Sequence, residues 1–365
     1  MSVVIALLLI LLALWVAGAV FLKGRDLTAF DHPADASGIQ SFPDNGGPSE
    51  AHWEAVSAIR AFGQKAMGLS RKERLALMRS FMDEMGEQRT YESDFRPADA
   101  GGVPAEWVLA PGANARRRVL YLHGGAFIAG SPLSHRNITN RLAVITGGAV
   151  LAVDYRLMPE HRRADGIADC RAAYRWILEN GPDGVASPEF LAVGGDSAGG
   201  NLALSLIAWV RDEGLRQPDA VVALSPTVDG TFASPSIAAN VDTDIMLGPL
   251  FSVLLRIPQT IRRWMYVLEN RFNPANPVVS PVFGDLSGLP PVLVQVSEAE
   301  MLLDDARRYV NKARAAGSPA LVQSWPHMLH VWQMFYPEMP EARAAWDEID
   351  RFLAAPRSVV SAPGA

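Results

Sequence analysis

The stretch Gly195-Asp196-Ser197-Ala198-Gly199 (GDSAG) decides the fold prediction. It lies between a short apolar run at 190–193 and an amphipathic stretch at 198–212, which predict a strand and a helix. A serine between glycines at such a junction is typical of a tight turn that lifts the hydroxyl above a sheet. A serine at a helix start is otherwise a common capping residue, so the motif alone leaves both interpretations open.

Apolar runs and amphipathic stretches alternate on both sides of this motif. Further strands are predicted at 119–122, 149–153, 220–224, 292–296 and 320–322, and further helices at 137–145, 165–180, 304–316 and 341–353. This alternation predicts an α/β fold with a mostly parallel sheet and helices on both faces. The 365 residues suffice for one such domain with an insertion.

The first 25 residues are predicted to form a transmembrane anchor. Residues 3–22 carry no charge and, at 1.5 Å per residue, would span a hydrocarbon core of roughly 30 Å. A cleaved signal peptide, which would lead to export, is the alternative, because Ala17-Gly18-Ala19 offers a small-x-small cleavage pattern. Lys23 and Arg25 follow the apolar segment, so the positive-inside rule predicts that the main domain is cytoplasmic.

The remaining chain divides by composition. Residues 26–48 are rich in Asp, Pro, Ser and Gly and predict an extended linker. The main domain is expected over 49–356, followed by a flexible tail over 357–365. Helical patterns within 49–90, together with the long insertion at 229–273, predict a helical cap over a binding site.

Composition argues against several classes of function. A formal net charge of −6 and the lack of a Lys/Arg run argue against nucleic acid as a partner. The single cysteine, Cys170, cannot form an intrachain disulfide and is expected to be a small buried residue. The sequence contains no metal-binding His/Cys pattern, phosphate loop or dinucleotide motif, so neither a metal nor a cofactor is expected.

A second glycine motif, HGGAF at 123–127, follows the predicted strand at 119–122. Consecutive glycines let backbone N–H groups face a substrate oxygen, so the motif predicts an oxyanion hole formed by Gly124, Gly125 and Ala198. A plain β-turn is the alternative for this motif alone. Its pairing with the serine motif favours the oxyanion hole.

The sequence resembles the hormone-sensitive lipase family of α/β-hydrolases, which includes bacterial esterases and arylacetamide deacetylase. The similar segments follow the family's order over about residues 90–354: HGGAF (123–127), DYRLMPEH (154–161), GDSAGGN (195–201), VSP followed by GLPPVLVQVSEAE (within 279–300), and MLH (328–330). The resemblance implies an α/β-hydrolase fold with a cap, a Ser–acid–His triad and cofactor-free hydrolysis of carboxylic esters. One departure is Ala126, which replaces the family's third glycine and should leave the first two N–H donors intact.

The resemblance also assigns the triad. Ser197 matches the nucleophile and His330 the base, with His327 as the alternative base. The family's acidic segment commonly reads Asp-Pro-Leu-x-Asp, whereas this chain reads EMLLD at 300–304. Glu300 falls where the catalytic aspartate stands and is assigned as the acid, with Asp304 as the alternative.

The predicted reaction is hydrolysis of short- to medium-chain apolar acyl esters through an acyl-enzyme on Ser197. A catalytically silent ligand-binding protein is the alternative from another class, and a replaced triad residue would favour it. A lactonase or an amide deacetylase would use the same site. The expected partners are a small ester and, through residues 3–22, a membrane; the sequence also permits a homodimer.

Overall fold

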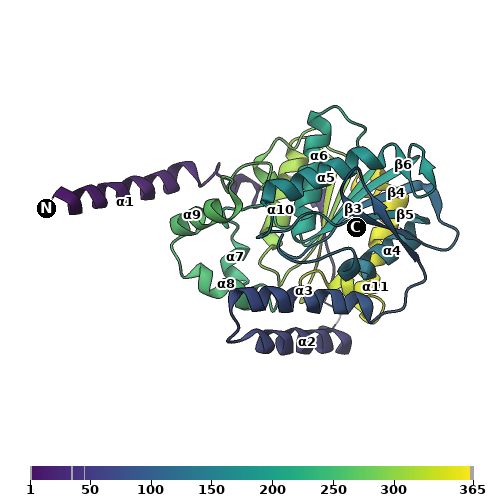
Figure 1. Ribbon diagram of the computed structural model, residues 1–365, viewed down its shortest axis with the longest axis horizontal. Coiled ribbons are helices and arrows are strands. Elements are labelled where there is room, and N and C mark those ends of the chain that lie inside the picture. Colours follow the sequence, from purple (N-terminus) through teal and green to yellow (C-terminus); the bar gives the residue numbers. More distant parts are fainter. Residues whose placement is uncertain (1, 34–35, 45, 362–365) are drawn as a thin grey trace.

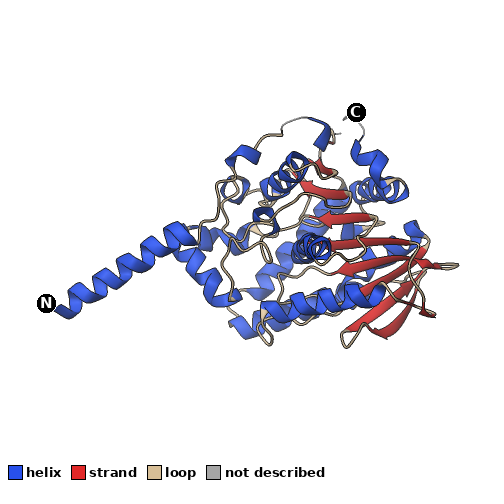
Figure 2. Cartoon of the chain, turned by 90° about the horizontal axis from the view of Figure 1, so that it is seen from above, coloured by secondary structure: helices blue, strands red, loops and turns tan. Residues whose placement is uncertain are grey.

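The computed structural model describes residues 2–33, 36–44 and 46–361. Over these residues, a nine-stranded sheet has the order β1-β11-β10-β9-β8-β4-β5-β3-β2 (Figures 1 and 2). Its strands are β1 (Ile39–Ser41), β2 (Asp94–Asp99), β3 (Pro104–Leu109), β4 (Asn114–Leu122), β5 (Gly148–Val153), β8 (Phe190–Asp196), β9 (Ala220–Leu224), β10 (Val292–Ser297) and β11 (Ala320–Trp325). The pairs from β1 through β5 in this order are parallel, whereas β3 is antiparallel to β5 and β2. The predicted α/β fold with a mostly parallel sheet is confirmed.

Helices cover both faces of the sheet because its central strands are apolar on both sides. Leu120 and Leu122 of β4 pack in a cluster with α5 and α6, whereas Val119 and Tyr121 pack in a cluster with α4 and α11. Successive side chains of a strand point to opposite faces, which produces this division. The helices are α4 (Arg136–Thr146), α5 (Arg163–Ile177), α6 (Ala198–Asp212), α10 (Leu303–Ala315), α11 (Pro340–Ala354) and α12 (Pro356–Ser361).

The two-residue strands β6 (Asn180–Gly181) and β7 (Gly184–Val185), which form a separate hairpin, were not predicted, and neither were three strands of the nine-stranded sheet, namely β1, β2 and β3. The strand β2 alternates exposed and half-buried residues and contains Pro97, and β1 is only three residues long. Neither has the continuous apolar run that marks the buried parallel strands. These strands lie towards the edges of the sheet, where burial is incomplete.

Parts of the segment 26–48, interpreted from the sequence as an extended linker, pack on the domain. Its strand β1 pairs with β11, Leu27 is buried, and Asp31 forms an ion pair with Arg308 (2.5 Å). Scattered apolar residues, without a period, provide this attachment. The predicted tail also differs, because α12 forms a helix whose Val360 is buried. Residues 362–365 lie outside the described residues.

The remaining helices are α1 (Ser2–Phe21), which projects from the domain, and the helices of the two predicted cap segments (Figure 1). The segment Val3–Phe21 of α1 is long and apolar enough to cross a membrane, as a signal sequence also would be. The predicted cap segments contain α2 (Glu50–Ala66) and α3 (Arg71–Glu87), and α7 (Ser236–Ala239), α8 (Gly248–Leu255) and α9 (Gln259–Asn270).

Candidate active site

The residues predicted for the site follow the carboxyl ends of parallel strands. Because these ends meet at one edge of the sheet, residues far apart in the sequence become neighbours there. The turns after β4, β8, β10 and β11 supply Gly124, Ser197, Glu300 and His330, respectively, and the turn after β9 adds Ser225, which was not predicted.

Ser197 lies on a strained turn between β8 and α6. Its φ of 51° is in the left-handed region, and its N–H donates to the carbonyl of Leu224 (2.7 Å). A side chain at Gly199 would collide with the backbone of Leu122 and His123. The neighbouring chain therefore requires glycine there, and the turn holds the Ser197 hydroxyl above the strand ends.

A hydrogen-bonded chain joins Ser197, His330 and Glu300. The distance between His330 Nε2 and Ser197 Oγ is 2.9 Å, and that between His330 Nδ1 and Glu300 Oε2 is 2.6 Å. His330 and Glu300 are buried, and Ser197 is half-buried. Burial alone lowers the pKa of His330, but the hydrogen bond and charge of Glu300 outweigh it and raise this pKa above its ordinary value.

The carboxylate of Glu300 has two further donors. The hydroxyl of Ser225 and the N–H of Ser297 each donate to Oε1 at 2.8 Å. Burial raises the pKa of Glu300, and the hydrogen bond from His330 opposes this rise. The two hydrogen bonds to Oε1 hold the carboxylate in place, so its other oxygen, Oε2, stays directed at the imidazole. Ser225 was not identified from the sequence, where it has no recognisable motif.

The two alternative residues lie elsewhere. His327 is half exposed, and its Nε2 is 3.0 Å from Oδ2 of Asp44. Asp304, in the first turn of α10, accepts a hydrogen bond from the N–H of Ser236 (2.9 Å). Neither contacts Ser197 or His330 in the described hydrogen bonds, so Glu300 and His330 are the pair that the geometry favours.

The glycine loop differs from its prediction at Gly124. The N–H of Gly124 donates to Asp196 Oδ1 (2.9 Å), so it is directed below the loop and away from an incoming oxygen. Among the described hydrogen bonds, the N–H groups of Gly125, Ala126 and Ala198 have no protein acceptor. The free donors are therefore shifted by one residue, and Ala126 (φ 54°), missed from the sequence, takes the place predicted for Gly124.

A buried polar cluster holds this loop from below. Asp196 accepts from the hydroxyl of Tyr121 (2.5 Å), and its Oδ2 lies 3.4 Å from His135 Nε2. Burial raises the pKa of Asp196, but His135 and Tyr121 outweigh this effect, and the pKa is lowered. The carboxylate is thus kept ionised as an acceptor for Gly124. Its place in the GDSAG motif indicated such support, whereas Tyr121 and His135 carried no local signal.

His123 supports the same loop by stacking. Its ring lies 4.2 Å from that of Tyr155, centroid to centroid, and its Nδ1 donates to the carbonyl of Gly124 (2.8 Å). Burial, reinforced by the charge of His135, lowers the pKa of His123 to about 3. The imidazole stays neutral at physiological pH and shapes the loop.

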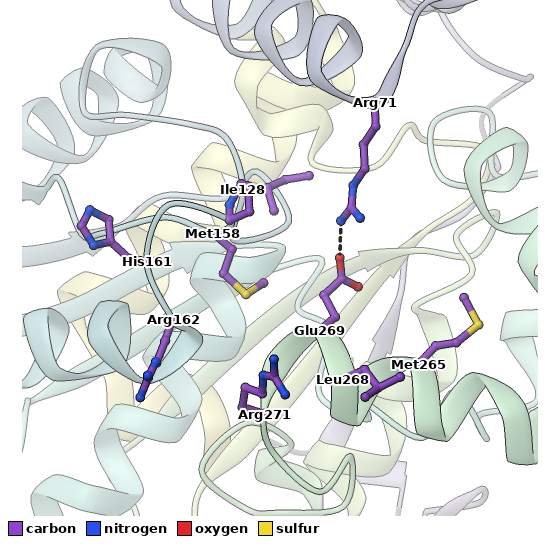
Figure 3. A pocket seen from close by; sticks show the side chains of 10 residues that line it. Arg71, Ile128, Met158, His161, Arg162, Met265, Leu268, Glu269 and Arg271 are labelled. Atoms are coloured by element: carbon purple, nitrogen blue, oxygen red, sulfur yellow. Dashed lines mark hydrogen bonds and ion pairs between the residues drawn. The ribbon is translucent and has the colours of Figure 1, made fainter.

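A surface cleft of about 910 Å³ lies beside the glycine loop (Figure 3). Its walls come from the start of α3, from α9 and from the loop after β5, and Ser197 and His330 are not among the lining residues. Met158 joins the cleft to the glycine loop, because its N–H donates to the carbonyl of Phe127 (2.9 Å). Within the described residues, no group of three or more His, Cys, Asp or Glu side chains could hold a metal ion.

A serine on a strand–helix turn, bonded to a histidine that binds a buried acid above a mostly parallel sheet, defines the class of α/β-hydrolases. Comparison with known proteins agrees. A family model described as alpha/beta hydrolase fold (Abhydrolase_3) matches residues 119–334, and the chain belongs to this family.

The relatives with named activities indicate which reaction this member of the family catalyses. An acetyl-hydrolase of Streptomyces hygroscopicus is 38% identical over 253 residues, covering 69% of this chain and 80% of that protein. An esterase of Acinetobacter venetianus is 35% identical over 257 residues, covering 70% of this chain and 80% of that protein. A crystal structure of an esterase from the bacterial hormone-sensitive lipase family matches with a TM-score of 0.73 and 34% identity, over 86% of this chain and all of that one. The resemblance to that family is confirmed, and the protein is a carboxylic ester hydrolase.

Proposed function

We propose that Ser197 is the nucleophile of this esterase, His330 its general base and Glu300 the acid that orients the base. The observation that carries the assignment is the unbroken chain from Ser197 Oγ to His330 Nε2 (2.9 Å) and from His330 Nδ1 to Glu300 Oε2 (2.6 Å). A neutral imidazole with its Nδ1–H held by a carboxylate presents Nε2 as a proton acceptor.

In the proposed reaction, Ser197 Oγ attacks the ester carbonyl carbon while its proton passes to His330 Nε2. The negative charge on the carbonyl oxygen is stabilised by the N–H groups of Gly125, Ala126 and Ala198. His330 then returns the proton to the leaving alcohol oxygen, which leaves an acyl-enzyme. A water molecule then attacks this acyl group while His330 Nε2 takes its proton, and that proton passes to Ser197 Oγ as the bond between Oγ and the acyl carbon breaks and the carboxylic acid leaves.

The substrates that we propose are esters of short- to medium-chain apolar acids. One relative is named an acetyl-hydrolase, which supports a small acyl group. The insertion 229–273 carries partly buried apolar side chains, among them Phe232, Leu247 and Phe251, that pack against Met301 and Leu302 beside Glu300. This packing supports the assignment of the insertion, together with 49–90, as a cap with an apolar inner surface.

We also propose that α1 is retained as a membrane anchor and that the catalytic domain is cytoplasmic. The side chains at positions 3–16 are exposed, so the apolar helix has no protein partner along most of its length. Lys23 and Arg25, just after it, support the orientation. Alkaline extraction and protease protection of the full chain test the assignment; a mature chain that begins after Ala19 would establish export instead.

The esterase assignment is tested with p-nitrophenyl esters from acetyl to palmitoyl. The Ser197→Ala variant should lose activity on every ester and lose labelling by a fluorophosphonate, whereas Ser80→Ala, an exposed serine on α3, should keep both. Turnover greatest at short chains supports the proposed acyl preference. A folded parent protein that turns over no ester would contradict the triad and favour a ligand-binding protein.

A further inference from the structure

One end of the domain exposes an unusual number of apolar side chains. Leu250 and Val253 of α8 are 69% and 65% exposed, and Met67, in the turn between α2 and α3, is 77% exposed. On α9, Ile261, Met265 and Leu268 are also exposed, and their spacing of four and three residues places them on one side of the helix. These six residues are called the apolar face below.

The apolar face lies at the end of the domain from which α1 departs. In Figure 1, α8, α9 and the α2–α3 turn lie towards this end, and α1 extends away from it. The contact between α1 and α9 is direct: Trp264 Nε1 donates to the carbonyl of Leu14 (3.0 Å). Gly18 permits this approach, since a side chain there would collide with Trp264 and Thr260.

If α1 crosses a bilayer, its length determines how deeply α9 lies in that bilayer. The 19 residues Val3–Phe21 span about 28 Å at 1.5 Å per residue, so all of them are needed to cross a hydrocarbon core of roughly 30 Å. The carbonyl of Leu14 already contacts α9, and that of Phe21 accepts from Asn273 (2.9 Å). The last third of α1 therefore lies beside α9, and a bilayer crossed by α1 must also reach the exposed side of α9.

The charges around the apolar face suit an anionic lipid surface. Residues 246–272 contain four arginines, of which Arg263 is buried, and one glutamate, and residues 65–74 contain four basic side chains and one glutamate, although the whole chain carries −6. Lys23 and Arg25 add to this end. Apolar side chains rimmed by basic ones are typical of helices that lie in the membrane interface.

The cleft opens between the apolar face and the glycine loop. Met265 and Leu268 line one wall from α9, and Ile128 and Met158 line the other (Figure 3). An ion pair between Arg71 and Glu269 (2.7 Å) joins α3 to α9 across it. An ester that leaves the lipid beside α9 would meet apolar side chains on both of these walls, with Arg162 and Arg271 among the other lining residues, and Ile128 lies just beyond the glycine loop.

We propose that the apolar face docks in the bilayer interface and that the cleft admits esters dissolved in that bilayer. The proposal rests on the proposed anchor and esterase activity, and it adds the lipid surface as the source of substrate. The domain then lies against the membrane through α8 and α9, with the cleft mouth at the depth of the lipid headgroups.

Depth measurements on the full chain test the docking. Cys170 is buried, so single cysteines at Leu8, Val253, Leu268 and Val185 can each carry an environment-sensitive fluorophore. Val185 is 88% exposed and belongs to the hairpin of β6 and β7, at the opposite end of the domain (Figure 1). In vesicles of phosphatidylcholine and phosphatidylglycerol with nitroxide-labelled lipids, we expect quenching at positions 8, 253 and 268 and none at 185.

The outcomes separate the proposals. Quenching at Leu8 without quenching at 253 and 268 would leave the anchor in place and overturn the docking. No quenching at Leu8 would remove the anchor and the docking with it. A blue-shifted signal at 253 in detergent that disappears on dilution would identify the face as a contact between two copies of the chain, which also overturns the docking.

A second experiment tests delivery of the substrate. The variant Leu250→Asp/Val253→Asp should hydrolyse a long-chain ester embedded in vesicles at least about tenfold more slowly, while its turnover of p-nitrophenyl acetate stays within about twofold. The matched control is Val185→Asp, which should change neither rate. Equal loss on both substrates, or loss on neither, overturns the role of the face. A parent that hydrolyses no ester would refute the proposed function, whereas the quenching results would still decide the docking.

Discussion

Two buried histidine–carboxylate pairs lie on either side of Ser197, and they differ in what the histidine does with its second nitrogen. In the pair of His330 and Glu300, the second nitrogen reaches Ser197 Oγ (2.9 Å). In the pair of His135 and Asp196, the Nδ1 of His135 contacts the hydroxyl of Ser134 (2.8 Å) and faces no nucleophile. The first pair can move a proton to or from the reacting serine, whereas the second can only hold its surroundings in place.

The pKa values of the two carboxylates are also shifted in opposite directions. Burial dominates at Glu300 and raises its pKa, whereas at Asp196 the opposing effects of His135 and Tyr121 outweigh burial and lower the pKa. Asp196 thus remains a permanent acceptor for the N–H of Gly124 (2.9 Å). In the proposed mechanism, the same two residue types serve proton transfer in one place and loop geometry in the other, and the partner of the histidine decides which.

The largest expected effect separates the two histidines. The variant His330→Gln should lower kcat by about 10⁴-fold or more, because Ser197 loses its base. The variant His135→Gln should lower kcat by only about tenfold, through a less firmly held glycine loop. Steady-state hydrolysis of p-nitrophenyl acetate measures both, with circular dichroism to verify folding. Comparable losses in two folded variants would refute the division of roles.

Of the two pairs, only that of His330 and Glu300 was predictable from the sequence. Ser197 lies in a glycine motif between a predicted strand and a predicted helix. His330 and Glu300 were assigned by the resemblance to the hormone-sensitive lipase family, Glu300 by counting from Pro291. The fold was equally accessible, because its central strands are continuous apolar runs.

The other pair depends on contacts between distant residues. Tyr121 and His135 reach Asp196 only after β4, β8 and the turn before α4 have been brought together. For the same reason, the engagement of the Gly124 N–H by Asp196 could not be read from the HGGAF motif. The strand β1 was missed because its pairing with β11 spans some 280 residues of sequence.

The next effect in size concerns the two carboxylates. The variant Glu300→Gln should lower kcat by about 10²- to 10⁴-fold with little change in KM, because an amide can hold His330 in the wrong tautomer. The variant Asp196→Asn should keep most activity but lose about 1–3 kcal/mol of unfolding free energy near pH 7. Enzyme kinetics and urea denaturation measure the two quantities. A stability loss confined to Glu300→Gln would contradict the proposed difference.

The acid dependence of stability follows from the sign of the Asp196 shift. Because its folded-state pKa lies below the ordinary value, Asp196 stabilises the fold above that ordinary value. This contribution disappears as the pH falls through the lowered folded-state pKa. We expect urea midpoints of the parent and Asp196→Asn to converge between about pH 5 and pH 2, and curves that stay parallel over this range would argue against the ionised acceptor.

The pH–rate profile sharpens the assignment of the base. His330 must be neutral to accept the serine proton, and its pKa is raised by Glu300, so activity should increase with pH with a midpoint above the ordinary imidazole value of 6.5. In Glu300→Gln, the residual activity should show this midpoint at lower pH, because only the smaller effects of the Asp244 and Asp196 charges then oppose the lowering of the His330 pKa by burial. The dependence of kcat/KM on pH measures both midpoints, and an unchanged midpoint in the variant would remove Glu300 as the partner.

The smallest effect concerns the hydroxyl that fixes the acid. Ser225 donates to Glu300 Oε1 (2.8 Å) and accepts from the N–H of Val331 (3.3 Å), so Ser225→Ala leaves Ser297 as the remaining donor on that oxygen. We expect kcat to fall by about three- to tenfold and stability to fall by about 1 kcal/mol.

Ser234→Ala is the matched control, because Ser234 is also buried and donates to a buried carboxylate, that of Asp305, which has no contact with His330. It should cost a similar amount of stability and leave kcat unchanged. The difference between the two kcat values then isolates the orientation of Glu300 from the general cost of losing a buried hydrogen bond. If both variants lost activity equally, the orientation of Glu300 would not depend on Ser225, and the N–H of Ser297 alone would be sufficient to hold it.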